Sequence, residues 1–232
     1  MRLLTVLLPI MRLCVLGMLA LLFVRDVMRR HPEHLPWTPL VLNAPIGWAT
    51  GTKLAELRGD IPRCRALLAA AGVAVRPAAD LRRISRCRIA DAVQVDRLGL
   101  PLLPDKVVLS CPMAAATYVW VQQVVRPAAR ATLGTDATSI GNLGSYNCRT
   151  IAGSERLSEH ATANAIDIGA IRLANGGSVA VARDWGKGSR GTFLRKIRDG
   201  GCRLFRVVLS PDYNAAHRDH LHVDLGTFGS CR

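Results

Sequence analysis

Hydrophobic and polar residues follow several distinct patterns along this chain, and the first is an apolar run. Residues 1–24 read MRLLTVLLPIMRLCVLGMLALLFV, with Arg12 between two apolar stretches. A bilayer-spanning helix needs about 20 apolar residues, and residues 3–24 reach that length if Arg12 is tolerated. No small-x-small cleavage site follows. The pattern predicts an N-terminal transmembrane anchor over residues 1–28, with cleavage of a signal segment and secretion as the alternative.

Helix signals follow a segment that is rich in proline and glycine. Residues 29–58 contain several prolines and glycines and two tryptophans, and we interpret them as a linker to a domain over residues 59–232. Asp60 and Pro62 favour a helix start, and Gly72 favours its end. Residues 112–133 are helical in composition, and Pro127 is expected to kink or split that helix.

Strand signals dominate the remainder of the domain. Short apolar segments at residues 73–75, 91–95 and 107–110 have strand character. The runs AIDIGAIRLA and SVAVARDW flank Asn175-Gly176, which is a strong hairpin signal. A short helix is expected over TFLRKIRDG, and strands over LFRVVLS and HLHVDLG. The fold class predicted is α+β, with a small antiparallel sheet flanked by helices.

Charge and composition narrow the class of partner. The 232 residues carry a formal net charge of +14, which favours an anionic partner such as nucleic acid, a phospholipid surface or an acidic cell-wall polymer. The basic residues are dispersed, and no stripe of basic and aromatic residues indicates single-stranded nucleic acid. We therefore do not expect a nucleic-acid partner.

The cysteines indicate an oxidising compartment. Cys14 lies in the apolar segment, and six further cysteines follow at positions 64, 87, 111, 148, 202 and 231. An even number beyond an export-type segment is typical of a disulfide framework. Six cysteines allow 15 pairings. Sequence proximity favours 64–87, 111–148 and 202–231, and the other pairings stay open.

Three of the six histidines fall within HRDHLHVDLG, residues 217–226. In HLHVDL the apolar residues alternate strictly with polar ones, as in a strand with one buried face. On such a strand His220 and His222 point to the same side. An isolated histidine of this kind is most often a surface residue, and His31 and His34 in the predicted linker are expected to be simply solvated.

A metal site becomes the better interpretation once a second segment is included. In SEHATANAIDI, Asp167 stands between two isoleucines, which predicts a strand with Asp167 on its polar face. A turn lets His160 fold back over it. If the two strands are neighbours, His160, Asp167 and His222 form a ligand set suited to Zn²⁺ with a fourth position open to water. His220 would then transfer protons.

These residues resemble the extensin-like C-terminal domain family, which is related to zinc D-alanyl-D-alanine carboxypeptidases, murein endopeptidases and hedgehog-type domains. The similar segments are GSYNCR, RLSEHATANAIDI and PDYNAAHRDHLHVDLG, within a resemblance over residues 45–232. It implies one Zn²⁺ held by His160, Asp167 and His222, and a peptide or amide bond, in peptidoglycan, as substrate. Ala163 stands where many members of the family have glycine.

The resemblance also implies roles for neighbouring residues. His220 and His217 would handle protons, and Ser158 would orient the ligand loop by hydrogen bonding. Arg149 would hold a substrate carboxylate or the developing oxyanion, with Arg156 as the alternative. A related branch has a catalytic glutamate at the position of Asp219, so the identity of the general base stays open.

These expectations combine into one hypothesis with two alternatives. The hypothesis is a zinc-dependent peptidase on the bacterial inner membrane, with its domain facing the periplasm and acting on peptidoglycan stems or cross-links. The first alternative is a non-catalytic zinc-containing module that binds the cell wall or signals, because a fold alone does not establish activity. The second is a structural exported domain whose histidines bind no metal.

Overall fold

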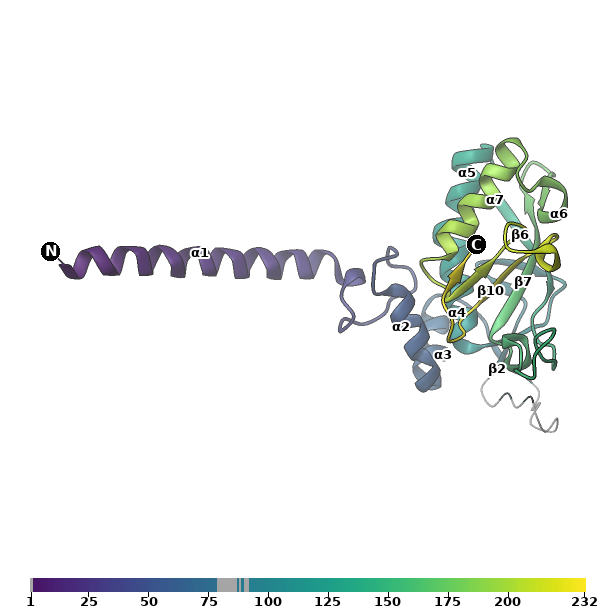
Figure 1. Cartoon of the computed structure of the whole chain (residues 1–232), viewed down its shortest axis with the longest axis horizontal. Helices are drawn as coiled ribbons and strands as arrows, with labels where there is room; N and C mark the ends of the chain where they lie inside the picture. The colour runs from purple at the N-terminus through teal and green to yellow at the C-terminus, as the bar shows by residue number, and fades with distance from the viewer. Residues whose placement is uncertain (1, 79–86, 88, 90–91) are drawn as a thin grey trace.

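The predicted α+β class is confirmed by a computed structural model, which describes residues 2–78, 87, 89 and 92–232, with only the backbone for residues 2–6 and 8–10. Helices pack against a mainly antiparallel sheet. Figure 1 shows this domain at one end of the molecule and a single long helix extending from it toward the N-terminus.

Helical elements occur along the whole chain. They are α1 (Arg2–Arg30), η1 (Pro32–His34), α2 (Thr50–Glu56), η2 (Leu57–Gly59), α3 (Ile61–Ala70), α4 (Cys111–Trp120), the π-helical segment η4 (Val121–Val125), α5 (Arg126–Leu133), η5 (Glu159–Thr162), α6 (Val181–Asp184), α7 (Gly188–Gly201) and η6 (Ala215–His217). Asp60 caps α3 by accepting a hydrogen bond from the Arg63 backbone N–H at 3.1 Å. The predicted break at Pro127 is not seen: the backbone stays in the right-handed helical region from α4 through η4 into α5, and the π-helical segment η4 lies directly before Arg126 and Pro127.

The strands form two sheets. They are β1 (Arg76–Pro77), β2 (Ala92–Val95), β3 (Arg97–Leu98), β4 (Leu100–Leu103), β5 (Val107–Ser110), β6 (Ala137–Gly144), β7 (Ala165–Leu173), β8 (Ser178–Ala180), β9 (Val207–Leu209), β10 (Leu221–Asp224) and β11 (Ser230–Cys231). The larger sheet has the order β11-β9-β10-β7-β6-β4-β3, with β8 also paired to β7, and the smaller has the order β1-β2-β5. The predicted hairpin around Asn175-Gly176 is confirmed as the antiparallel pair β7–β8. Its second strand ends at Ala180, because the chain turns into α6 there.

Several predicted boundaries move in the structure. Residues 73–75 form no strand, and Asp91, expected to begin the strand now seen as β2, lies outside the described residues. β10 starts at Leu221, so His220 precedes the strand instead of opening it. Residues 40–57, interpreted as linker, place Leu40, Leu54 and Leu57 in the same core as the domain.

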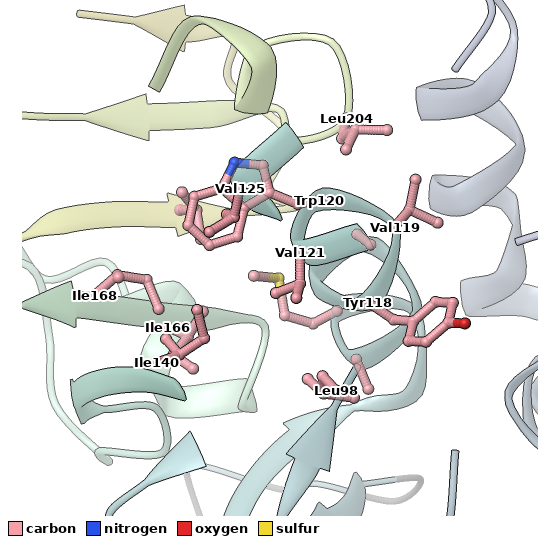
Figure 2. Packing of buried hydrophobic residues seen from close by; sticks show 14 of the residues in the cluster. Leu98, Tyr118, Val119, Trp120, Val121, Val125, Ile140, Ile166, Ile168 and Leu204 are labelled. Atoms are coloured by element: carbon pink, nitrogen blue, oxygen red, sulfur yellow. The ribbon is translucent and has the colours of Figure 1, made fainter. Parts of the chain in front are cut away.

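The core lies between the larger sheet and the helices of the 111–133 segment. Every residue of α4 is buried, and Trp120 is fully enclosed, with its indole N–H donating to the Ile197 carbonyl at 2.8 Å. Ile166 and Ile168 of β7 pack into this core, as Figure 2 shows. Because side chains alternate along a strand, the face of β7 that carries Asp167 is directed away from the core.

Three disulfides link the domain, and two of the proximity-based pairings are wrong. Cys202–Cys231 is confirmed, whereas the other bonds join Cys64 to Cys111 and Cys87 to Cys148. The cause is tertiary: α3 packs against the start of α4, which brings Cys64 to Cys111 across 47 residues of sequence.

The N-terminal helix α1 is exposed along its described length. Its apolar side chains between Met11 and Val24 are about half to two-thirds accessible to solvent. Within residues 2–78, 87, 89 and 92–232, no helix combines the length and the apolar content that crossing a membrane requires.

Candidate metal centre

A cross-strand pair forms the base of the site. β10 and β7 run antiparallel, and the register places His222 directly opposite Asp167. Leu221 and Val223 are buried in the core, so His222 lies on the outer face of the sheet with Asp167. The distance between His222 Nδ1 and Asp167 Oδ1 is 2.9 Å.

His160 reaches the same point from a short 3-10 turn. Ser158 Oγ accepts a hydrogen bond from the His160 backbone N–H at 3.3 Å at the start of η5. The turn ends at Ala163, which has a positive φ of 54°, a conformation that glycine adopts at lower cost. His160 Nε2 lies 3.1 Å from His222 Nδ1 and 3.3 Å from Asp167 Oδ1, and its side chain is buried.

The outer hydrogen bonds of the His160 and His222 rings leave one nitrogen of each ring directed at the point where the three ligand atoms converge. His160 Nδ1 lies 2.5 Å from the Ser145 carbonyl oxygen, which can only accept, so in the neutral ring Nδ1 carries the hydrogen and Nε2 the lone pair. His222 Nε2 lies 3.0 Å from Asp224 Oδ2, so the same argument leaves the lone pair of the neutral ring on Nδ1. Such outer hydrogen bonds are typical of metal-binding histidines.

The distances also match a tetrahedral ion. With metal–ligand bonds of about 2.0–2.1 Å, two ligands of a tetrahedral Zn²⁺ lie about 3.3 Å apart. The three separations between His160 Nε2, His222 Nδ1 and Asp167 Oδ1 are 2.9, 3.1 and 3.3 Å. The donor set, two imidazoles and one carboxylate, is one that zinc accepts. These residues therefore fit a zinc ion without rearrangement of the backbone.

The charges of the group depend on one another. Burial raises the pKa of Asp167, but the interactions with His160 and His222 outweigh it and hold this pKa well below its usual range. Burial lowers the pKa of His222, but its hydrogen bonds to Asp167 and Asp224 outweigh that effect and raise the pKa to about 9. In the metal-free group, a proton on His222 therefore supplies the positive charge that a bound metal ion would otherwise supply.

His220 and His217 border the three ligand atoms without joining them. His220 Nε2 lies 3.6 Å from Asp167 Oδ1, and its Nδ1 is held by Asp219 Oδ1 at 2.8 Å. Asp219 lies in a turn and holds the His220 ring in this orientation. His217 packs against His220 with ring centroids 5.1 Å apart, and burial, with the charges of His220 and His222, lowers its pKa to about 4.

The group opens into a cleft of about 570 Å³. Arg149 and Arg156, which the resemblance singles out, are both exposed and both line this cleft. Two further residues belong to the site. Asp224 is buried against His222, and its position two residues along the same strand face is the sequence signal for this contact. Tyr213 lines the cleft and contacts His217 edge-on, and no sequence signal identified it.

A second histidine cluster does not fit a metal. His31, Glu33 and His34 place possible ligand atoms within 4.8 Å of one another. His34 Nδ1, however, accepts the Trp48 backbone N–H at 3.2 Å, so in the neutral ring the hydrogen lies on Nε2, which faces Glu33 at 3.7 Å. That arrangement leaves no lone pair of His34 for an ion.

The chain matches the sequence family described as Extensin-like protein C-terminus over residues 62–232. No curated protein and no solved structure matches the chain. The matched region contains the sheet, the three disulfides, and His160, Asp167 and His222. The chain therefore belongs to the extensin-like C-terminal family.

Proposed function

We propose that the protein is an exported zinc-dependent peptidase that cleaves a peptide or amide bond in peptidoglycan. The observation that carries the proposal is the convergence of His160 Nε2, His222 Nδ1 and Asp167 Oδ1 at separations suited to a tetrahedral ion. The resemblance to zinc peptidases suggests the reaction.

A bound zinc ion would polarise the scissile carbonyl and lower the pKa of a water molecule. The chain's own residues would move the protons. With Nδ1 anchored on Asp219, neutral His220 keeps the lone pair of Nε2 directed at the site, where it can take a proton from water and return it to the leaving amine. His217, whose pKa of about 4 keeps it neutral at pH 7, can relay that proton through the His220 side of the cleft.

Arginine on the cleft wall would stabilise negative charge. Arg149 is exposed and lines the cleft, so its guanidinium is accessible to a substrate carboxylate or to charge that develops on the carbonyl oxygen. The net charge of +14 would favour an acidic wall polymer over a neutral one.

The proposed location is the bacterial inner membrane with the domain facing the periplasm, or secretion after removal of the N-terminal segment. Three disulfides support an oxidising compartment. The exposed apolar side chains between Met11 and Val24 support contact of α1 with lipid.

The test is a paired measurement of metal content and of cleavage. Zinc-loaded protein is incubated with purified peptidoglycan, and new amino and carboxyl termini are counted. We expect one zinc per chain in the wild type, loss of that zinc in His160→Ala and Asp167→Ala, and retained zinc in His220→Ala with a rate lower by a factor of about 10²–10⁴. His31→Ala is the matched control.

Two outcomes would contradict the proposal. Zinc-loaded wild type that binds peptidoglycan and releases no new termini would favour a non-catalytic cell-wall module. Absence of zinc from the wild type, or equal zinc in His160→Ala, would remove the metal centre and with it the proposed reaction.

A further inference from the structure

A hairpin forms one wall of the cleft. Thr150 and Leu157 form an antiparallel bridge, and the Ile151 N–H donates to the Arg156 carbonyl at 2.8 Å. The hairpin is also joined at its base, where the Ser158 N–H donates to the Arg149 carbonyl at 3.1 Å. Residues 149–158 are therefore an ordered element between the Cys87–Cys148 disulfide and the turn that carries His160.

The C-terminal tail lines the same cleft. Gly226, Thr227, Phe228 and Ser230 lie along it. β11 pairs with β9, and the Cys202–Cys231 disulfide ties the end of the tail to the end of α7. This anchoring holds Phe228 in position, although 59% of its surface is exposed to solvent.

Arg156 and Phe228 connect the two walls. The guanidinium carbon of Arg156 lies 4.3 Å from the centroid of the Phe228 ring. Stacking uses the flat face of a guanidinium and leaves its N–H edge available for a planar anion. Among the described residues, no carboxylate lies within ion-pair distance of Arg156, so this edge has no acidic partner within that part of the chain.

Apolar surface accompanies this charge. Ile151 and Leu157 of the hairpin line the cleft and are 44% and 37% exposed, and Tyr213 lines it too, with 44% exposed. Large exposed apolar side chains that gather in one cleft indicate a binding surface rather than scattered surface residues. The cleft thus combines a cation with free donors and a set of apolar contacts.

We propose that the Arg156–Phe228 pair determines substrate specificity: Arg156 binds a carboxylate that the substrate carries near the scissile bond, and Phe228 with Ile151 and Leu157 receives an adjoining apolar group. This inference rests on the proposed function, since it names the kind of peptide that this site takes. The two residues bind substrate and take no part in proton transfer.

The experiment compares two probes that differ only in charge. One is a stem peptide released from purified peptidoglycan, and the other is the same peptide with its carboxylates converted to amides. We expect the wild type to prefer the acidic peptide, and Arg156→Ala to raise KM for it by roughly tenfold to a hundredfold, as for loss of a charge-assisted hydrogen bond. The KM for the amide and the kcat for both should change little.

Further variants separate recognition from structure. Arg156→Lys keeps the charge but loses the planar fork, so it should recover only part of the preference. Phe228→Ala should weaken binding of both peptides. Arg172→Ala removes an exposed arginine on β7 outside the cleft and is the matched control for net charge. Zinc content and thermal midpoint are measured for each variant to exclude misfolding.

Equilibrium binding of fluorescently labelled forms of the two peptides distinguishes failure of this inference from failure of the proposed function. If the wild type cleaves or binds both peptides equally, or if Arg156→Ala retains the preference, the specificity role is wrong while peptidase activity stands. If no peptide is cleaved but binding still depends on the carboxylates and on Arg156, the recognition role stands and the peptidase proposal is wrong.

Discussion

Zinc binding to the group of His160, Asp167 and His222 should release one proton near neutral pH, and that proton should come from His222. Hydrogen bonds to Asp167 and Asp224 raise the pKa of His222 to about 9, so in the metal-free protein both ring nitrogens carry hydrogen at pH 7. The ion needs the lone pair of Nδ1, which that proton occupies. The carboxylate of Asp167 is already ionised and releases none in this range, because its pKa lies well below its usual value.

The size of the effect follows from the distance between the pH and this pKa. At pH 7, two units below about 9, only about one molecule in a hundred has Nδ1 free. The apparent zinc affinity at pH 7 should therefore be roughly a hundredfold weaker than above pH 9, and should rise about tenfold for each unit between pH 6.5 and 8.5.

The same proton determines the stability of the metal-free fold. The folded pKa of His222 exceeds the ordinary histidine value of 6.5, so its stabilising contribution is complete below about pH 6.5 and is lost as the pH rises to about 9. In the presence of zinc, the free energy of unfolding should instead rise with pH over this range, because zinc takes the place of the proton on His222.

The assay is competition with a chromogenic chelator between pH 6.5 and 8.5, with proton release measured by calorimetry in two buffers of different ionisation enthalpy. Asp224→Asn is the diagnostic variant. It keeps an acceptor for His222 Nε2 but removes the negative charge that helps to hold the proton on this ring. The rise of zinc affinity with pH should therefore level off at a lower pH than in the wild type. Its affinity at pH 8.5 should fall about 10–100-fold with the loss of the outer carboxylate. A zinc affinity independent of pH, or zero proton release at pH 7, would refute the reasoning.

Three further predictions concern stability and location. Trp120→Phe should lower the free energy of unfolding in urea by about 1–3 kcal/mol, because the Ile197 carbonyl loses its buried donor, and an unchanged midpoint would contradict that role. Replacing Cys202 and Cys231 by serine should cost about 3–4 kcal/mol in the chain-entropy estimate for a loop of 29 residues, measured in the same titration, and a loss below 1 kcal/mol would show that the tail is held by other contacts. Deleting residues 1–28 should move the protein from the membrane pellet to the soluble fraction after cell lysis, and a full-length chain already in the soluble fraction would contradict membrane attachment.

Local signals in the sequence were sufficient for several of the helices and strands and for the faces of β7 and β10. Asp60, Pro62 and Gly72 predicted the helix that became α3, and Asn175-Gly176 predicted the β7–β8 hairpin. The alternation of isoleucine with Asp167 predicted a strand with that carboxylate facing away from the core. Each signal acts within a few residues, where backbone sterics and side-chain hydrogen bonds dominate.

These local signals could not predict contacts between segments that are distant in the sequence. Alternation predicts which face His222 occupies, but a sheet register places it opposite Asp167, and a shift of one residue would put an isoleucine there instead. The Cys64–Cys111 bond depends in the same way on helix packing. Alternation also predicts the face on which Asp224 lies and not what covers it; here the buried carboxylate accepts from His222 and from the Gly226 N–H.

The boundary between loop and strand at His220 has a functional consequence. Because β10 begins only at Leu221, Asp219 and His220 escape the two-residue alternation, and adjacent side chains can contact each other. The proposed ligands Asp167 and His222 lie on paired strands, whereas His217, Asp219 and His220 lie on one short loop. Substitutions in that loop should therefore change the movement of protons while metal binding persists, and this separation makes the comparison of His220→Ala with Asp167→Ala informative about mechanism rather than about folding.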